Sequence, residues 1–510
     1  MHDTDQPQKS MDRGDMISEY NSTECFDYLD AVFPGYHLSG QYRPNALEEQ
    51  RGSLSWGASL VGRSYLRVYE KTGDHKYLRG FIGIGEQLLL ARDQVRGAVD
   101  YLGRSGPVWR SGRPYTTNYN SFRCGAIEGP CLEIRSKQAA HIRIENIRHE
   151  NGTFDISFLS SPQESALAAF EDVSVLAGTE NNLAEVLTRQ HWKSPQAAAV
   201  ISHYGCVKCL NEPGLYDLVE QYYAPAIHVS QICLALLEFS KLVNGKPDLY
   251  AIYGQYADKY TEAALAALEV YDSDYRVSSG RGYYIIPADA PSDFEGTDAP
   301  QNHNMSMALC FLSLYRITEK ATFKSRATEL VRTFRDALTH LEFNGQDCLV
   351  WSYFVPMLDN FRGHSGGNRS RWRSSRKGNP RMEDMSHAVL AIEAAVEAHL
   401  LGIEVTALDL QGMANTFVSA AATGTLSSYI DGTAGYGKYD AVAGRWSILG
   451  PWDSRVYEIA LRITQTTQPQ PLHASVLLSC ANLVAYAPLG SDSYPSMGGW
   501  GTNASRVDSG

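Results

Sequence analysis

The most constraining feature of this sequence is a succession of amphipathic segments whose apolar residues recur with the period of an α-helix. Residues 54–69 carry apolar side chains at helical spacing and stop before Gly73, and Asp74 can cap a second such segment from Lys76 onward. These two segments predict a helical hairpin with a tight turn. A helix with one apolar face must bury that face against a neighbour, so a series of such pairs predicts stacked hairpins.

The same pattern continues along the rest of the chain. A related segment, residues 302–318, ends in Tyr315-Arg-Ile-Thr318, which is similar to Tyr69-Glu-Lys-Thr72 at the end of the first helix. The other predicted helices span residues 217–243, 247–271, 383–402, 405–421, 452–464 and 471–487. We therefore expect an all-α dominated fold, an (α/α) toroid or barrel of stacked helical hairpins, with a polar cleft of carbohydrate size at one end.

Three segments depart from the helical rhythm. Residues 131–160 alternate in strand fashion around Asn151-Gly152, which predicts a small β-hairpin insertion. Residues 276–300 are rich in Gly, Ser, Asp and Pro around a short strand, and residues 359–382 form a long loop of Gly, Ser and Arg. Long loops in compact domains are often functional, so we expect these two segments to wall the cleft.

Length and hydropathy suggest the domain organisation and the location. The chain has 510 residues, more than a typical single domain, but stacked hairpins can extend one continuous core. The sequence thus predicts one catalytic domain over residues 23–490, between a flexible arm (1–22) and a tail (491–510). The arm has no apolar core of a signal peptide, and no apolar run is long enough to cross a membrane. We expect a cytoplasmic protein with no membrane partner, or a secreted one if a leader was removed.

The charge and the cysteines narrow the classes of ligand. A net charge of −12 argues against a nucleic-acid surface, which needs clustered Lys and Arg. One local basic run, residues 362–381, favours an anionic saccharide as the substrate. The nine cysteines are scattered and odd in number, unlike a disulfide framework. His203, Cys206 and Cys209 lack a fourth ligand at standard spacing, so the sequence predicts no metal and no cofactor, and it leaves the oligomeric state open.

Several short motifs resemble those of (α/α)-toroid polysaccharide lyases that cleave uronate polymers, of the alginate and glucuronan lyase type, and more distantly those of glucuronyl C5-epimerases. The matching strings lie near the N-terminus, in the middle and in the last third: Arg51-Gly-Ser-Leu-Ser-Trp56-Gly-Ala-Ser, Tyr69-Glu-Lys-Thr-Gly-Asp74, Asp100-Tyr-Leu-Gly-Arg-Ser-Gly-Pro107-Val-Trp109-Arg, Glu383-Asp384-Met-Ser-His387-Ala, Gly435-Tyr-Gly-Lys-Tyr and Gly444-Arg-Trp446. The resemblance implies a carbohydrate-active lyase that removes a proton α to a carboxylate and eliminates the leaving oxygen.

That reaction needs a base, an acid and donors beside the substrate carboxylate. His303 lies at the start of a predicted helix. It is a candidate to bind the carboxylate of the substrate, and so is Asn304. Tyr353 ends a short strand before the basic loop and is the candidate base or acid; as a phenolate it would need a nearby cation. His387 lies three residues after Asp384 on one helix face, where the carboxylate can hold the imidazole for proton transfer.

The predicted site therefore has three catalytic residues, Tyr353, His303 and His387, which we expect to line one cleft. The predicted substrate-binding residues are Asn302, Asn304, Asp384, Arg371, Arg381, Asp100, Arg110, Trp109 and Trp351.

Other functions fit the same sequence. A uronate epimerase would use the same proton abstraction, and a glycoside hydrolase would need two opposed carboxylates, for which Asp100 and Asp384 are the best pair. A small-molecule cyclase or isomerase and a saccharide-binding protein without catalysis are the remaining alternatives.

Overall fold

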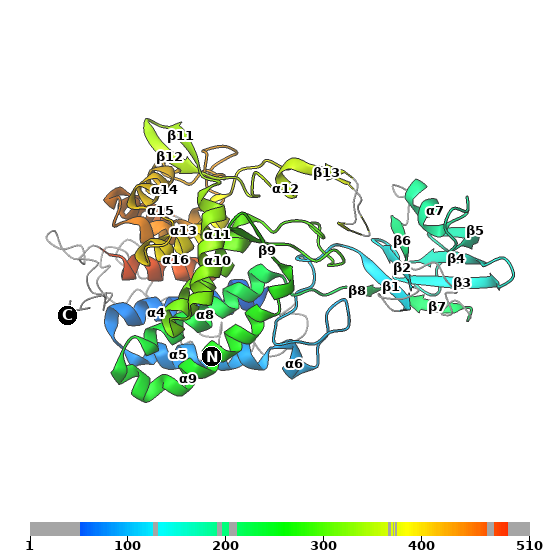
Figure 1. Ribbon diagram of the computed structural model, residues 1–510, viewed down its shortest axis with the longest axis horizontal. Helices are drawn as coiled ribbons and strands as arrows, with labels where there is room; N and C mark the ends of the chain where they lie inside the picture. The colour runs from blue at the N-terminus through cyan, green and yellow to red at the C-terminus, as the bar shows by residue number, and fades with distance from the viewer. Residues whose placement is uncertain are drawn as a thin grey trace, which may run out of the picture.

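The computed structural model describes residues 52–125, 131–190, 196–202, 212–365, 369–370, 372, 375–466 and 474–487. The predicted arm (1–22) and tail (491–510) lie outside these ranges, and so do His203, Cys206 and Cys209. Two lobes are visible in Figure 1, a helical body and a smaller β lobe that projects from one side of it.

The helical body contains most of the predicted helices. Its main helices are α4 (Ser59–Thr72), α5 (His75–Leu90), α8 (Ala226–Asn244), α9 (Pro247–Glu269), α10 (Gln301–Thr318), α11 (Ala321–Arg335), α13 (Met385–Leu400), α14 (Ala407–Ala420), α15 (Ser454–Thr466) and α16 (Ala474–Ala485). Shorter helical segments are η1 (Leu54–Ala58), α6 (Asp93–Arg96), η3 (Asp272–Asp274), α12 (Asp359–Arg362) and η4 (Asp440–Leu449).

The first hairpin forms as its sequence predicts. Gly73 ends α4 in the left-handed conformation, with φ of 70°, which glycine adopts without a steric penalty. The carboxylate of Asp74 then caps α5 by accepting a hydrogen bond of 2.8 Å from the backbone N–H of Lys76. Two capping residues thus fix the turn between the helices.

The centre of the body is α8, which packs against α4, α9 and α10. It is long and apolar enough to cross a membrane, but most of its side chains are buried inside the fold, as in the core helix of a globular protein. The same apolar core extends to α13, α14 and α16.

The β lobe consists of two four-stranded antiparallel sheets and α7 (Leu183–Arg189). One sheet has the order β6-β2-β1-β8 and the other β5-β4-β3-β7. Their strands are β1 (Asn120–Gly125), β2 (Cys131–Ser136), β3 (His141–Arg148), β4 (Thr153–Leu159), β5 (Ala168–Ser174), β6 (Ala197–Ser202), β7 (Gly214–Asp217) and β8 (Val219–Glu220). The lobe has an apolar core of its own, and Cys124 on β1 is disulfide-bonded.

The predicted hairpin around Asn151-Gly152 is the β3–β4 pair, in which alternate side chains such as Ile144 and Phe158 are buried. Three further hairpins lie in the body: β9 (Tyr275–Ser278) with β10 (Arg281–Tyr284), β11 (Thr339–Phe343) with β12 (Gln346–Val350), and β13 (Gly363–Ser365) with β14 (Ser375–Lys377).

The prediction of an all-α dominated toroid is therefore wrong. The chain is about 48% helical and 19% strand, with five small antiparallel sheets, which is a mixed α and β content. The main cause is the region between α6 and α8, where one predicted hairpin is in fact two sheets. The predicted helix at 217–243 also begins later than expected, at Ala226, because β7, β8 and Pro225 precede it.

Candidate functional site

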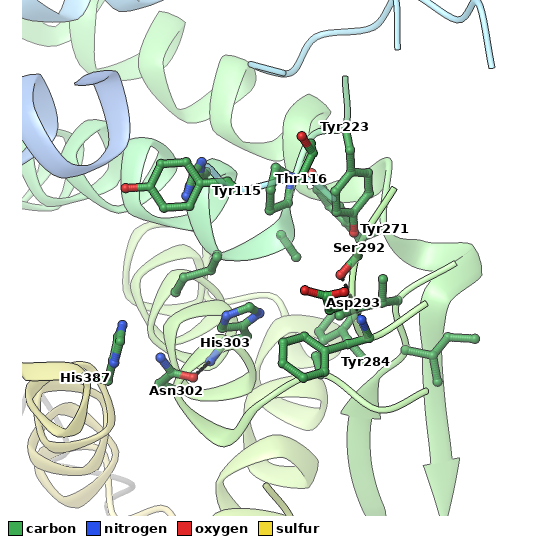
Figure 2. Close-up of a pocket in the computed structure, with 18 of the residues that line it drawn as sticks. Tyr115, Thr116, Tyr223, Tyr271, Tyr284, Ser292, Asp293, Asn302, His303 and His387 are labelled. Carbon is green, nitrogen blue, oxygen red and sulfur yellow. Dashed lines mark hydrogen bonds between the residues drawn. The ribbon is translucent and has the colours of Figure 1, made fainter. Parts of the chain in front are cut away.

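A pocket with a cavity volume of about 250 Å³ opens between the N-terminal ends of α8, α10 and α13. Figure 2 shows Asn302 and His303 at the start of α10, with His387 on one side of them and Ser292 and Asp293 on the other. The residues that line the pocket are Trp56, Pro114, Tyr115, Thr116, Tyr223, Pro225, Ala226, Ile227, His228, Tyr271, Tyr284, Ile285, Ile286, Ser292, Asp293, Phe294, Ala299, Asn302, His303, Tyr353 and His387.

Backbone pairing between distant segments brings the predicted catalytic residues together. The N–H of Gln301, which begins α10, donates to the carbonyl of Tyr353 at 2.9 Å. The N–H of Tyr353 donates in turn to the carbonyl of Arg381 at 2.9 Å, just before α13. Tyr353 is thus tied by its backbone to the segments that carry His303 and His387, and all three side chains line the pocket.

His387 is held in place by the residue that caps its helix. One carboxylate oxygen of Asp384 accepts hydrogen bonds from the N–H groups of Ser386 and His387, and the other lies 2.6 Å from Nδ1 of His387. Burial would raise the pKa of Asp384, but the hydrogen bonds and charge of His387 outweigh it and lower that pKa below its ordinary value. The ring of His387 is thereby oriented toward the pocket.

Tyr353 is a protonated phenol in this environment. Its side chain is buried, its ring lies 6.1 Å from that of His387, and the Arg381 guanidinium lies 3.7 Å from its ring centroid. Burial raises the pKa of Tyr353 well above its ordinary value, the Glu383 carboxyl raises it further, and Arg381 offsets only part of this rise. The phenolate form is therefore disfavoured, and the O–H can donate a proton or a hydrogen bond.

His303 is an uncharged imidazole at the centre of the pocket. Burial, together with the nearby His387 and His228, lowers its pKa to about 3. Beside it, the amide oxygen of Asn302 accepts a hydrogen bond of 3.1 Å from the backbone N–H of His303. His303 is therefore unprotonated at neutral pH and has a free lone pair on its ring.

A second wall of the pocket is aromatic and centres on His228, near the start of α8. The indole N–H of Trp56 donates to Nε2 of His228 at 3.1 Å, and Ser111 Oγ lies 2.6 Å from Nδ1. Because an indole N–H can only donate a hydrogen bond, Nε2 of His228 carries no proton. In the neutral ring the proton is therefore on Nδ1, which faces Ser111. Burial lowers the pKa of His228 to about 3, and Tyr115 packs edge-on against its ring at 4.2 Å. His228 therefore orients this wall as a neutral ring.

The sequence predicts no role for His228, Trp56 or Asp293, although all three line the pocket. His228 is one of several polar residues on a mostly apolar helix, so the sequence offers only a weak signal for it. Trp56 belongs to one of the quoted motifs. Asp293 lies in residues 276–300, the Gly- and Pro-rich segment that the sequence predicts to wall the cleft. Residues of this segment line the pocket.

Several predicted substrate-binding residues have structural partners elsewhere. Asn304 is buried and bonds the backbone of Tyr284 and Ala299, so it fixes the loop before α10. Trp109 is buried with its indole N–H on the carbonyl of Leu88, and Trp351 is buried against Phe334. These side chains pack in the core and do not line the pocket.

The remaining predicted residues also lie away from the lining. Asp100 accepts hydrogen bonds from Arg104 at 2.7 Å and from its own loop backbone. The guanidinium of Arg110 lies over the ring of Tyr222 at 4.2 Å. Arg381 is exposed and reaches the site only through its contact with Tyr353. Arg371 is outside the described residues.

Comparison of this chain with family models, with curated proteins and with solved structures finds no match. The likeness to uronate lyases therefore rests only on the quoted motifs.

Proposed function

We propose that this protein is a lyase that cleaves a uronic-acid-containing saccharide by β-elimination. The observation that carries the proposal is the convergence of a neutral imidazole, His303, and a protonated phenol, Tyr353, on one pocket next to the Asp384–His387 pair. Elimination needs a base and an acid in opposite protonation states at the same time. The pocket supplies both without a prior proton exchange with solvent.

In the proposed reaction His303 takes the proton from C5 of the uronate, α to the carboxylate. The electron pair of that C–H bond forms the C4=C5 double bond while the C4–O4 bond breaks. Tyr353 gives its phenolic proton to the departing O4, and His387, whose ring lies 6.1 Å from that of Tyr353, is placed to help restore that proton. The amide of Asn302 lies next to His303 and is the candidate hydrogen-bond donor to the substrate.

The aromatic wall suits a saccharide as the substrate. Trp56 and Tyr115 present rings on which the apolar face of a sugar can stack, and His228 fixes the orientation of Trp56. The cavity of about 250 Å³ is small beside typical ligand pockets of roughly 300–1,000 Å³, which favours a terminal sugar unit over a long polymer segment.

A glycoside hydrolase on this pocket is less well supported. Such an enzyme needs two carboxyl groups that flank the scissile bond. Among the described residues that line the pocket, Asp293 is the sole carboxylate, and Asp100 is engaged with Arg104 elsewhere. An epimerase and a binding protein without catalysis remain distinguishable by product analysis.

The proposal is tested by incubating the protein with α-linked and β-linked uronate oligosaccharides. The reaction is followed by the near-ultraviolet absorbance of the C4=C5 double bond, which is conjugated to the carboxylate. We expect unsaturated product from the wild type. Tyr353→Phe and His303→Gln should each lower kcat by about 10²–10⁴-fold, the usual contribution of one acid or base. Tyr250→Phe, which removes an exposed phenol far from the pocket, should leave the rate unchanged.

If no oligosaccharide yields unsaturated product, β-elimination is excluded for these substrates. Exchange of the C5 proton with deuterated solvent without such a product would indicate an epimerase, whereas new reducing ends without it would indicate a hydrolase.

A further inference from the structure

Elimination from a uronate requires a positive group at the substrate carboxylate, because the C5 proton is a poor acid until that charge is neutralised. Among the described residues that line the pocket there is no Lys or Arg, and Asp293 adds a negative charge. His303 does not fill this role in the free protein, because burial lowers its pKa to about 3, and His387 is paired with the Asp384 carboxylate, which offsets any positive charge on its ring. The site as described thus needs one more source of positive charge.

A cluster beside His387 has the composition of a metal site. Glu383, Asp384 and His387 can each present one ligand atom such that the three atoms lie within 4.8 Å of one another. The side chain of Glu383 is completely buried, and its Oε2 has no hydrogen-bond partner among the residues that the structure describes. A buried carboxylate oxygen without a donor is unfavourable, and a bound cation would satisfy it.

The backbone around the cluster is held on both sides. The N–H of Glu383 donates to the carbonyl of Trp351 at 3.1 Å, and the carbonyl of Glu383 accepts from Ile430 at 3.1 Å. Asp384 pairs with Tyr429 and caps α13. The three side chains therefore start from fixed positions, which favours metal binding because little ordering is needed.

We propose that Glu383, Asp384 and His387 bind a divalent transition-metal ion, with Zn²⁺ or Mn²⁺ as the ions of fitting chemistry. Two carboxylates and one imidazole suit these ions better than Ca²⁺ or Mg²⁺, which prefer oxygen ligands alone. Three protein ligands leave at least one coordination position open, and His387 places the cluster at the pocket wall. This proposal departs from the sequence-based prediction of no metal.

The role of the ion depends on the proposed function, whereas its binding does not. At this position the cation would supply the positive charge that the substrate carboxylate needs. Arg381 lies over the ring of Tyr353 and is exposed, and it does not hydrogen-bond the buried Oε2 of Glu383.

The test is equilibrium dialysis of chelator-treated protein against Zn²⁺ and, separately, Mn²⁺, with the bound metal measured by atomic absorption. We expect about one equivalent per chain for the wild type and a loss of at least tenfold in affinity for Glu383→Gln and for His387→Gln. The matched control is His340→Gln. His340 forms an exposed pair with Asp347 at 2.9 Å but belongs to no described three-residue cluster, so its loss should leave binding unchanged.

Circular dichroism of each variant before dialysis tests whether the fold is intact. Co²⁺ substitution gives a second readout, because coordination by His387 should produce a visible absorption band that His387→Gln lacks. Less than a tenth of an equivalent in the wild type, or equal binding by the wild type and both variants, would overturn the metal site.

The two proposals fail separately. Metal binding without unsaturated product would leave the metal site standing and refute the lyase. Unsaturated product at an undiminished rate after chelation would leave the lyase standing and refute the role of the ion in the reaction, while the dialysis alone decides whether the ion binds.

Discussion

Asp298 is a buried carboxyl beneath the loop that carries Asp293 and Phe294. Its Oδ1 accepts a hydrogen bond of 2.8 Å from the N–H of Asn360, and its Oδ2 has no partner among the described residues. Burial raises its pKa from 3.8 to about 6, against the opposing effect of the Asn360 bond and of Arg376 and Arg369. The folded protein therefore binds this proton more tightly than the unfolded chain does.

The sign of the pH effect follows from that raised pKa. The stabilising contribution is fully present below about pH 3.8 and is lost as the pH rises through about 6. Asp298→Asn keeps the shape and removes the charge, so we expect it to stabilise the protein by about 1–3 kcal/mol at pH 7.5 and by much less at pH 4. Thermal unfolding of both proteins across this range is the measurement.

The control for this prediction is Asp258→Asn, at an exposed position on α9. A stabilisation by Asp298→Asn that does not change with pH, or one that Asp258→Asn reproduces, would show that the buried charge of Asp298 is not the cause.

The chemistry of single residues was the part of the site that the sequence could indicate. Polar groups at predicted helix starts, such as His303 and His387, stand out because apolar residues follow them. Asp100 and Trp109 carry similar signals, yet each has a local partner in the structure. Which polar residue faces a cavity depends on contacts between distant segments, and one sequence without relatives gives no measure of those contacts.

At the scale of elements, four helical segments meet at a buried network of charges. Arg63 on α4 donates to Glu238 on α8 at 3.0 Å and to Glu393 on α13 at 3.0 Å. Arg445 on η4 donates to Glu393 at 3.1 Å. All four side chains are buried, so neither Arg can exchange its partner for water. The network links segments that are far apart in the sequence.

Breaking this network should cost much more than breaking a surface pair. Glu393→Gln removes the negative charge that Arg63 and Arg445 share, and both guanidinium groups stay buried. We therefore expect a loss of about 3–5 kcal/mol in the free energy of unfolding. Glu86→Gln removes the half-exposed pair with Lys259 and should cost less than about 1 kcal/mol. Denaturant unfolding of the two variants measures both values, and similar losses would contradict the argument.

The helices were predictable as elements because each repeats its apolar pattern over several turns. Residues 383–402 and 405–421 closely match α13 and α14. The short strands had no comparable signal. β7 and β8 together span few residues, and their pairing partners, β3 and β1, lie seventy or more positions earlier. Strand pairing of this kind is decided by long-range contacts, so the helix predicted from residue 217 wrongly includes β8 and the last residue of β7.

For the whole molecule, the two lobes have separate apolar cores. One core fills the helical body around α8, and the other lies in the β lobe between its two sheets and α7. One contact between the lobes is that of the Arg135 guanidinium, which lies 3.7 Å from the ring centroid of Trp372. Because each lobe has a core of its own, we expect the lobes to unfold as separate cooperative units.

Two matched substitutions test whether the lobes unfold independently. Phe158 in the β lobe and Phe239 in the body are both completely buried phenylalanines. Phe158→Ala and Phe239→Ala should each cost about 3–5 kcal/mol, because both leave a cavity of the same chemistry. In differential scanning calorimetry we expect two transitions, of which Phe158→Ala lowers one and Phe239→Ala lowers the other. If either substitution lowers both transitions equally, or if a single transition moves as one, the two cores belong to one cooperative unit, and the β lobe is an integral part of the body.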